Sequence, residues 1–288
     1  MSERTIKGII QEFLRTGDHD PLFLQFPGND HLDRIRGGHR AHADALLTEV
    51  QIRSSSVAAL KRAILPQDIQ AFSRQKVEPM VRGLFKRVDQ EAVTTLLANS
   101  VVFITPDTVP TLIQHDDLHS AWLIANLYLS NIGADPISEE APPIVGFSAN
   151  TTCYVSMAYF EETTPFADYV VHEAAHVFHN ARRRDAGLMG RREDAWLLPI
   201  DFRKRETFAY ACEAYSRICE LADGAPARRS QLEELKGLPL PPDERVESDE
   251  YVDLLTNAVN CRIGWKAILE GCIAKRQSQH RATLRRMN

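Results

Sequence analysis

The stretch His172-Glu173-Ala174-Ala175-His176 decides how this chain is interpreted. Two imidazoles four residues apart lie on one face of a helix, about one turn from each other, so both can bind a single metal ion. Glu173 follows the first histidine, where its carboxylate could accept a proton from an attacking water molecule. The pattern therefore predicts a metal-binding helix with a general base. Two ordinary histidines on a structural helix are the alternative interpretation.

The residues around this motif predict a largely buried helix. Thr164-Pro165 is typical of a helix start, because proline in the first turn loses no hydrogen bond. The segment that follows is mostly apolar, and a run of arginines at 182–184 comes where cations suit a helix C-terminus. We expect Gly187 to end this helix.

A catalytic zinc ion usually has three protein ligands and one open position, so a third ligand must come from elsewhere. The best candidate is Glu206, because Glu206, Tyr210 and Glu213 recur at helical spacing and share one face. We predict that Glu206 binds the metal, that Tyr210 donates a hydrogen bond to a developing oxyanion, and that Glu213 orients one histidine. Glu213 as the ligand and a solvated polar stripe are the alternatives.

His179 continues the histidine series by one further turn. On a straight helix it lies about 10 Å along the axis from His172, too far for three histidines to share a tetrahedral ion. We therefore expect His179 to pack beside the site or to support a ligand. A role as a ligand itself is the alternative.

Together the two histidines, Glu173 and the downstream glutamate resemble the zincin metallopeptidases. A third ligand on a helix is more similar to the gluzincin branch than to the metzincins. Glu206 to Ala209 is similar to the third-ligand helix of several compact bacterial zincins, which is a weaker match than the first motif. The resemblance covers residues 100–215, and its specific part is the two helices.

This resemblance implies an α+β zincin-like catalytic domain with a Zn²⁺ cofactor bound by His172, His176 and Glu206. It also implies a peptidase in which Glu173 acts as general base and then passes its proton to the departing amine. Tyr210 is the preferred donor to the oxyanion.

A peptide substrate lying along an edge strand ahead of the metal helix is a further implication of the resemblance. Residues 150–160 occupy that place and are rich in β-branched and aromatic residues, which is typical of a strand. An edge strand offers unpaired N–H and C=O groups to an extended peptide. Tyr154 and Tyr159 in this stretch are alternative oxyanion donors. An ordinary sheet strand is the alternative interpretation of the segment.

The chain is expected to have two parts. Residues 1–95 have a mainly helical pattern and would cover the cleft or recognise a partner. Residues 96–288 would form the zincin-like domain. Within it we predict a strand at 101–104, an amphipathic helix at 116–131 and a C-terminal helix at about 251–276.

Composition describes an ordinary soluble protein of 288 residues, with 44% hydrophobic and 25% charged residues and a net charge of −5. The N-terminus lacks the basic start and apolar stretch of a secretory signal, and the longest apolar run is far too short for a membrane span. Five cysteines form no Cys-x-x-Cys pair, which favours reduced thiols. We therefore expect a cytoplasmic protein without a membrane partner.

The segment 182–205 contains more basic than acidic residues. A basic loop beside a metal site could hold nucleic acid or an acidic peptide. A solvated loop whose charges pair internally is the interpretation that we prefer.

Three function classes follow from these patterns. The leading prediction is a zinc-dependent peptidase that acts on a limited set of intracellular protein or peptide targets. The second is a regulatory or toxin-linked zincin that cleaves or senses one partner, such as a repressor. The third is a non-catalytic metal-binding scaffold, against which Glu173 argues because a structural site needs no proton acceptor.

Overall fold

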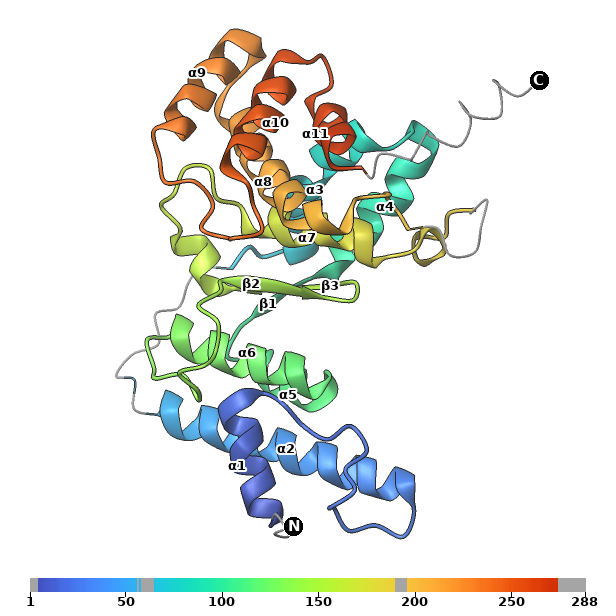
Figure 1. The fold of residues 1–288 in the computed structure, drawn as a ribbon, viewed down its shortest axis with the longest axis vertical. Coiled ribbons are helices and arrows are strands. Elements are labelled where there is room, and N and C mark those ends of the chain that lie inside the picture. Colours follow the sequence, from blue (N-terminus) through green and yellow to red (C-terminus); the bar gives the residue numbers. More distant parts are fainter. Residues whose placement is uncertain (1–4, 56, 58–64, 190–195, 274–288) are drawn as a thin grey trace, which may run out of the picture. The chain divides into compact units, whose positions relative to one another are not determined.

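Most of the chain that the structure describes is helical, and a small mixed sheet completes an α+β fold (Figure 1). The computed structural model describes residues 5–55, 57, 65–189 and 196–273. The helices in these ranges are α1 (Ile6–Thr16), α2 (His31–Ser54), α3 (Ile69–Leu84), α4 (Arg87–Ser100), α5 (Val109–His115), α6 (Leu118–Asn131), α7 (Tyr169–Asn180), α8 (Arg205–Leu221), α9 (Gly224–Lys236), α10 (Ser248–Asn260) and α11 (Gly264–Cys272). The strands are β1 (Val101–Ile104), β2 (Gly146–Ala149) and β3 (Thr152–Ser156), and the 3₁₀ turns are η1 (Met157–Glu161), η2 (Arg183–Ala186) and η3 (Phe202–Lys204).

The chain divides into two compact units, and neither is continuous in sequence. The first comprises Met1–Pro66, Val102–Ala149 and Tyr154–Glu162, and the second comprises Gln67–Val101, Asn150–Cys153 and Thr163–Asn288. The units therefore do not follow the boundary that we expected between residues 95 and 96. The reason is that α3 and α4 pack against each other and against α7, whereas α6 packs against α2 and α5.

The first unit has a helical core in which α6 is the central element. Phe13, Leu46 and Ile124 are completely buried there. The predicted helix at 116–131 is confirmed; it begins at Leu118 because the Asp117 side chain accepts a hydrogen bond from the Ser120 N–H and caps the helix.

The sheet has the strand order β1-β3-β2, so the strand predicted near 150–160 is central and not an edge. The expectation that a substrate adds to an edge strand at 150–160 is therefore wrong, because both sides of β3 are already paired. A two-residue turn with Asn150 at a φ of 53° brings β2 back onto β3, and this backbone conformation suits asparagine. The remainder of the predicted strand forms η1. The strand predicted at 101–104 is confirmed as β1.

In the second unit, the metal-motif helix α7 is shorter than we predicted. It begins at Tyr169 and not at Thr164-Pro165, because the Asp168 side chain accepts a hydrogen bond from the Val171 N–H and caps it. It ends at Asn180, and Gly187 ends the short η2 turn instead.

The C-terminal helix expected at 251–276 is divided into α10 and α11, with a break at residues 261–263. Its last expected residues, 274–276, lie outside the described residues. Within the described ranges, every helix is too short or too polar to cross a lipid bilayer.

Candidate metal centre

Three potential ligand atoms converge inside the second unit, from two helices that pack side by side (Figure 1). His172 Nε2 lies 3.3 Å from His176 Nε2, and Glu206 Oε2 lies 3.4 Å from His176 Nε2 and 3.9 Å from His172 Nε2. Ligand atoms about 2.0–2.1 Å from a tetrahedral zinc ion are about 3.3–3.4 Å apart. Two of the three separations match this value, and the third is somewhat longer. Two imidazoles and one carboxylate are also a typical donor set for zinc.

Local sequence explains why these groups meet. The spacing of four residues puts both histidines on one face of α7. Apolar side chains elsewhere on this helix, among them Val170, Val177 and Phe178, are buried in the core. Glu206 lies in the first turn of α8, where a carboxylate interacts favourably with the helix dipole. Both histidines are buried, which shields the site from bulk solvent.

Glu213 holds His172 and is not placed as a ligand. One of its oxygens accepts the Asp168 backbone N–H at 2.8 Å, and the other lies 3.0 Å from His172 Nδ1. Burial lowers the pKa of His172, but the hydrogen bond and charge of Glu213 outweigh it and raise that pKa to about 9. A metal ligand must be the neutral imidazole, and in that form a proton kept on Nδ1, facing Glu213, leaves the Nε2 lone pair available to a cation.

His179 supports the second histidine in the same way. Its Nε2 lies 3.4 Å from His176 Nδ1, and burial lowers the pKa of His179 to about 3, so this imidazole is neutral. When His176 Nδ1 donates to this imidazole, the Nε2 lone pair of His176 is available on the side that faces His172 Nε2. His179 is outside the converging group, in agreement with the expectation that it supports a ligand.

Glu173 lies next to the two histidines on α7 and is buried. Burial raises the pKa of Glu173, and the nearby imidazoles of His172 and His176 oppose that rise. A cation bound at the converging atoms would also oppose it, because a positive charge favours the carboxylate form.

Of the three candidate tyrosines, Tyr210 belongs to the same unit as the converging atoms and contacts His172. Its ring centroid is 4.4 Å from that of His172, in a T-shaped arrangement. Burial and nearby carboxylates raise the pKa of Tyr210 to about 12, so the phenol keeps its proton and can donate a hydrogen bond. Tyr154 and Tyr159 belong to the first unit, where the Tyr154 hydroxyl donates to Asp116 at 2.8 Å.

Sequence reasoning missed a pair of charged residues that contacts the site. Arg245 Nη1 lies 3.0 Å from the outer oxygen of Glu206, and Asp243 binds the guanidinium of Arg245. Both residues come from the loop before α10, far from the metal motif in sequence. The acidic, proline-rich character of this loop carries no signal of a metal site.

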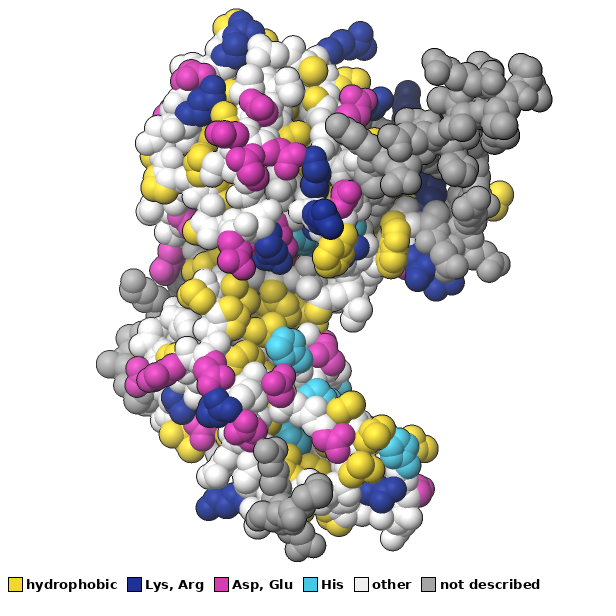
Figure 2. Space-filling model, in the orientation of Figure 1, with side chains coloured by type: hydrophobic (Ala, Val, Ile, Leu, Met, Phe, Trp, Pro, Cys, Tyr) yellow, Lys and Arg dark blue, Asp and Glu magenta, His cyan; other side chains and the backbone are white. Residues whose placement is uncertain are grey.

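Two basic side chains of the segment 182–205 pair with carboxylates from other parts of the second unit. Arg183 pairs with Asp89 at 3.4 Å, and Lys204 pairs with Glu250. Arg182 stacks over Trp196. Residues 190–195 of this segment lie outside the described residues. Acidic and basic side chains are also intermixed over the α9–α11 part of the surface in view (Figure 2).

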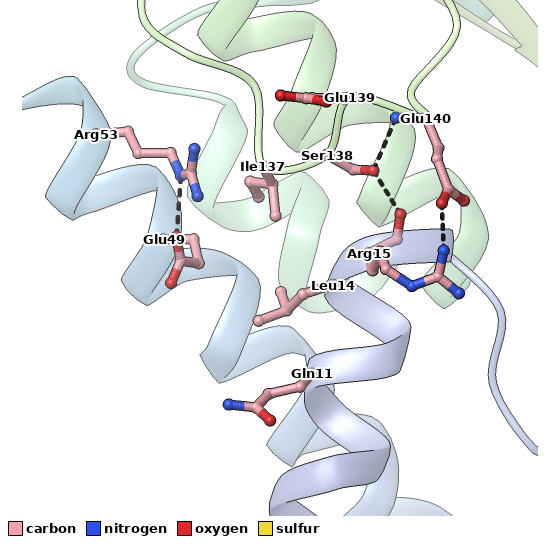
Figure 3. A pocket seen from close by; sticks show the side chains of 9 residues that line it. All are labelled: Gln11, Leu14, Arg15, Glu49, Arg53, Ile137, Ser138, Glu139 and Glu140. Atoms are coloured by element: carbon pink, nitrogen blue, oxygen red, sulfur yellow. Dashed lines mark hydrogen bonds and ion pairs between the residues drawn. The ribbon is translucent and has the colours of Figure 1, made fainter.

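A cavity of about 400 Å³ lies in the first unit between α1, α2 and the segment at 137–140 (Figure 3). Arg53 Nε lies 2.9 Å from Glu49 Oε2, and Arg15 pairs with Glu140. The Ser138 hydroxyl donates to the Arg15 carbonyl. The arginine charges are thus balanced by neighbouring carboxylates, which favours a structural role for this network.

No protein-family model, curated protein or solved structure matches this chain in sequence or fold comparisons.

Proposed function

We propose that this protein is a zinc-dependent peptidase of the zincin type, with a gluzincin-like set of ligands. One observation carries the proposal: three donor atoms of His172, His176 and Glu206 converge within 4.8 Å of one another. Two of these atoms are imidazole nitrogens, and the other ring nitrogens of the same histidines lie 3.0 Å from Glu213 and 3.4 Å from His179. Lone pairs directed at one point are stabilised by a cation.

The proposed ligands are His172, His176 and Glu206. A bound zinc ion supplies polarisation of the scissile carbonyl and lowers the pKa of a water molecule. Glu173 takes the proton of the attacking water and transfers it to the departing amine. Tyr210, which keeps its proton, donates a hydrogen bond to the developing oxyanion.

The buried Glu173 favours this catalytic role over a purely structural metal site. A structural zinc site is closed by four protein ligands, whereas only three donor groups converge among the residues that the structure describes. A carboxylate that is buried beside such a site without joining the donor group costs folding energy. A functional site is where such a cost is retained, because the group is needed for the reaction.

The test compares zinc content and hydrolysis of the wild-type protein with those of Glu173→Gln, which preserves shape and removes the base. Substrates are a denatured protein and a mixture of quenched fluorogenic peptides of varied sequence. We expect the variant to keep its zinc and to lose hydrolysis by at least about 100-fold. Glu233→Gln, on an exposed part of α9, is the control and should behave as wild type.

Equal hydrolysis by wild type and Glu173→Gln would rule out the proposed base. A wild-type protein that binds no zinc would rule out the proposal as a whole. A peptidase restricted to one regulatory partner would cleave few of these peptides, and new protein N-termini in cells that depend on Glu173 would then identify its target.

A further inference from the structure

The carboxylate of Glu206 divides its two oxygens between different partners. Oε2 faces the two histidines, at 3.4 Å from His176 Nε2, while Oε1 lies 3.0 Å from Arg245 Nη1. A free carboxylate can bind a metal through one oxygen or through both. An ion pair at Oε1 opposes binding through both, because Oε1 must then leave the guanidinium.

Arg245 is itself held in place by Asp243. The Arg245 Nε donates to both oxygens of Asp243, at 2.9 and 3.2 Å, and Nη2 donates to Oδ2 at 2.6 Å. The Arg245 backbone N–H also donates to Asp243 Oδ1 at 2.8 Å, and the Val246 N–H donates to the Asp243 carbonyl at 2.9 Å. Asp243 therefore fixes both the turn and the guanidinium that the turn presents.

This turn is anchored to the helix that carries Glu206. Val246 is buried, and Glu247 immediately after it caps α10 by accepting the backbone N–H groups of Asp249 and Glu250. Helix α10 packs against α8. Although the Arg245 side chain is exposed, its bonds to Asp243 hold the guanidinium against Glu206.

We propose that the Asp243–Arg245 pair is a positioning element that reserves the outer oxygen of Glu206, so that this ligand binds the metal through Oε2 alone. The inference rests on the proposed metal site. Binding through one oxygen leaves the fourth position of the metal open, as a catalytic zinc site requires. Because Asp243 balances the charge of Arg245, the pair positions Glu206 without adding net positive charge beside the metal.

The ion pair contributes little to folding. The Arg245 side chain is 64% exposed, and exposed ion pairs contribute little to stability. Loss of Arg245 should therefore change the coordination of the metal and leave the folded protein intact. The effect of Arg245 on metal coordination can therefore be measured without a loss of stability.

The test uses Co²⁺ in place of zinc in the full-length protein, because the intensity of the visible Co²⁺ spectrum falls as the coordination number rises. The variants are Arg245→Ala, Arg245→Lys and the charge-balanced double variant Asp243→Ala/Arg245→Ala. Arg82→Ala is the matched control, since Arg82 is 66% exposed and forms a comparable ion pair with Glu78 at 2.7 Å. Thermal unfolding of each metal-free protein is measured alongside.

We expect Arg245→Ala and the double variant to lose visible Co²⁺ absorption, and Arg245→Lys to recover part of it, because an ammonium can still pair with Oε1. Peptide hydrolysis should fall about 10- to 100-fold in kcat with little change in KM. The Arg82→Ala protein should match wild type in both measurements, and all metal-free proteins should unfold at similar temperatures.

An Arg245→Ala spectrum identical to that of wild type would overturn the positioning role while leaving the proposed function standing. A spectrum changed in Arg245→Ala but normal in the double variant would overturn it as well, because charge and not positioning would then be the cause. A wild-type protein that binds neither Co²⁺ nor zinc would overturn both this inference and the proposed function.

Discussion

Glu213→Gln tests how much the support of a single histidine contributes to the metal centre. In the wild-type protein both oxygens of Glu213 accept hydrogen bonds, from the Asp168 N–H at 2.8 Å and from His172 Nδ1 at 3.0 Å. An amide has one acceptor oxygen and one NH₂ donor. In either orientation of the amide, one N–H group of the protein would therefore face another N–H group.

The neutral imidazole can escape this conflict only by changing tautomer. With Nδ1 accepting from the amide, His172 would carry its proton on Nε2, the atom that faces Glu206 and the metal. Restoring the metal-binding tautomer costs a charge-assisted hydrogen bond, about 2–3 kcal/mol, which corresponds to about a 30- to 150-fold loss of zinc affinity.

Zinc affinity is measured by competition with a chromophoric chelator near neutral pH, and Glu220→Gln is the matched control. Glu220 lies two turns further along α8, where it pairs with Lys76 and Arg217 at the surface, so its variant should bind zinc as wild type does. Affinity of Glu213→Gln within about twofold of wild type would refute the role that we assign to this hydrogen bond.

Three further predictions concern stability. Burial lowers the pKa of His42 below its unfolded value. The stability that His42 contributes is therefore present above the unfolded pKa and is lost as the pH falls through the folded pKa. His42→Gln should reduce the slope of the unfolding free energy against pH on the acid side, measured by denaturant titration, and an unchanged slope would exclude His42 as its cause. Phe178→Ala should lower the free energy of unfolding by about 3–5 kcal/mol, because the Phe178 side chain is fully buried. Phe202 is 77% exposed, so Phe202→Ala should change the free energy of unfolding by about 1 kcal/mol or less. Similar losses for both variants would contradict the assigned core. Asp168→Ala should cost about 3 kcal/mol or more by urea unfolding, since it removes the cap of α7 and the ion pair with Lys76, and a loss below about 1 kcal/mol would contradict the importance of that cap.

Long-range pairing accounts for the errors of sequence reasoning in the fold. The segment at 150–160 has the composition of a strand, but composition does not reveal which strands flank it. Strand β2 has one aromatic and no β-branched residue, so its sequence does not predict a strand. The start of α7 was misplaced because a proline signal at Thr164-Pro165 competes with an aspartate cap at Asp168, and only the folded chain shows which prevails.

The parts of the centre that lie within one helix could be predicted from the sequence. The spacing of His172, Glu173 and His176 dictates their common location, because the period of the α-helix is a local property of the backbone. The same period grouped Glu206, Tyr210 and Glu213 on one face of α8. Helical periodicity does not predict whether Glu206 or Glu213 faces the histidines, because that depends on the rotation of α8 about its axis as it packs against α7.

Packing between elements far apart in sequence decided the remainder. The approach of α8 to α7 directs Glu206 toward both Nε2 atoms and leaves Glu213 beside Nδ1 of His172. The turn that carries Arg245 reaches Glu206 across some forty residues of chain. Helix periodicity is encoded locally, whereas the rotation of packed helices and the placement of loops follow from burial of the whole core, which no local pattern specifies.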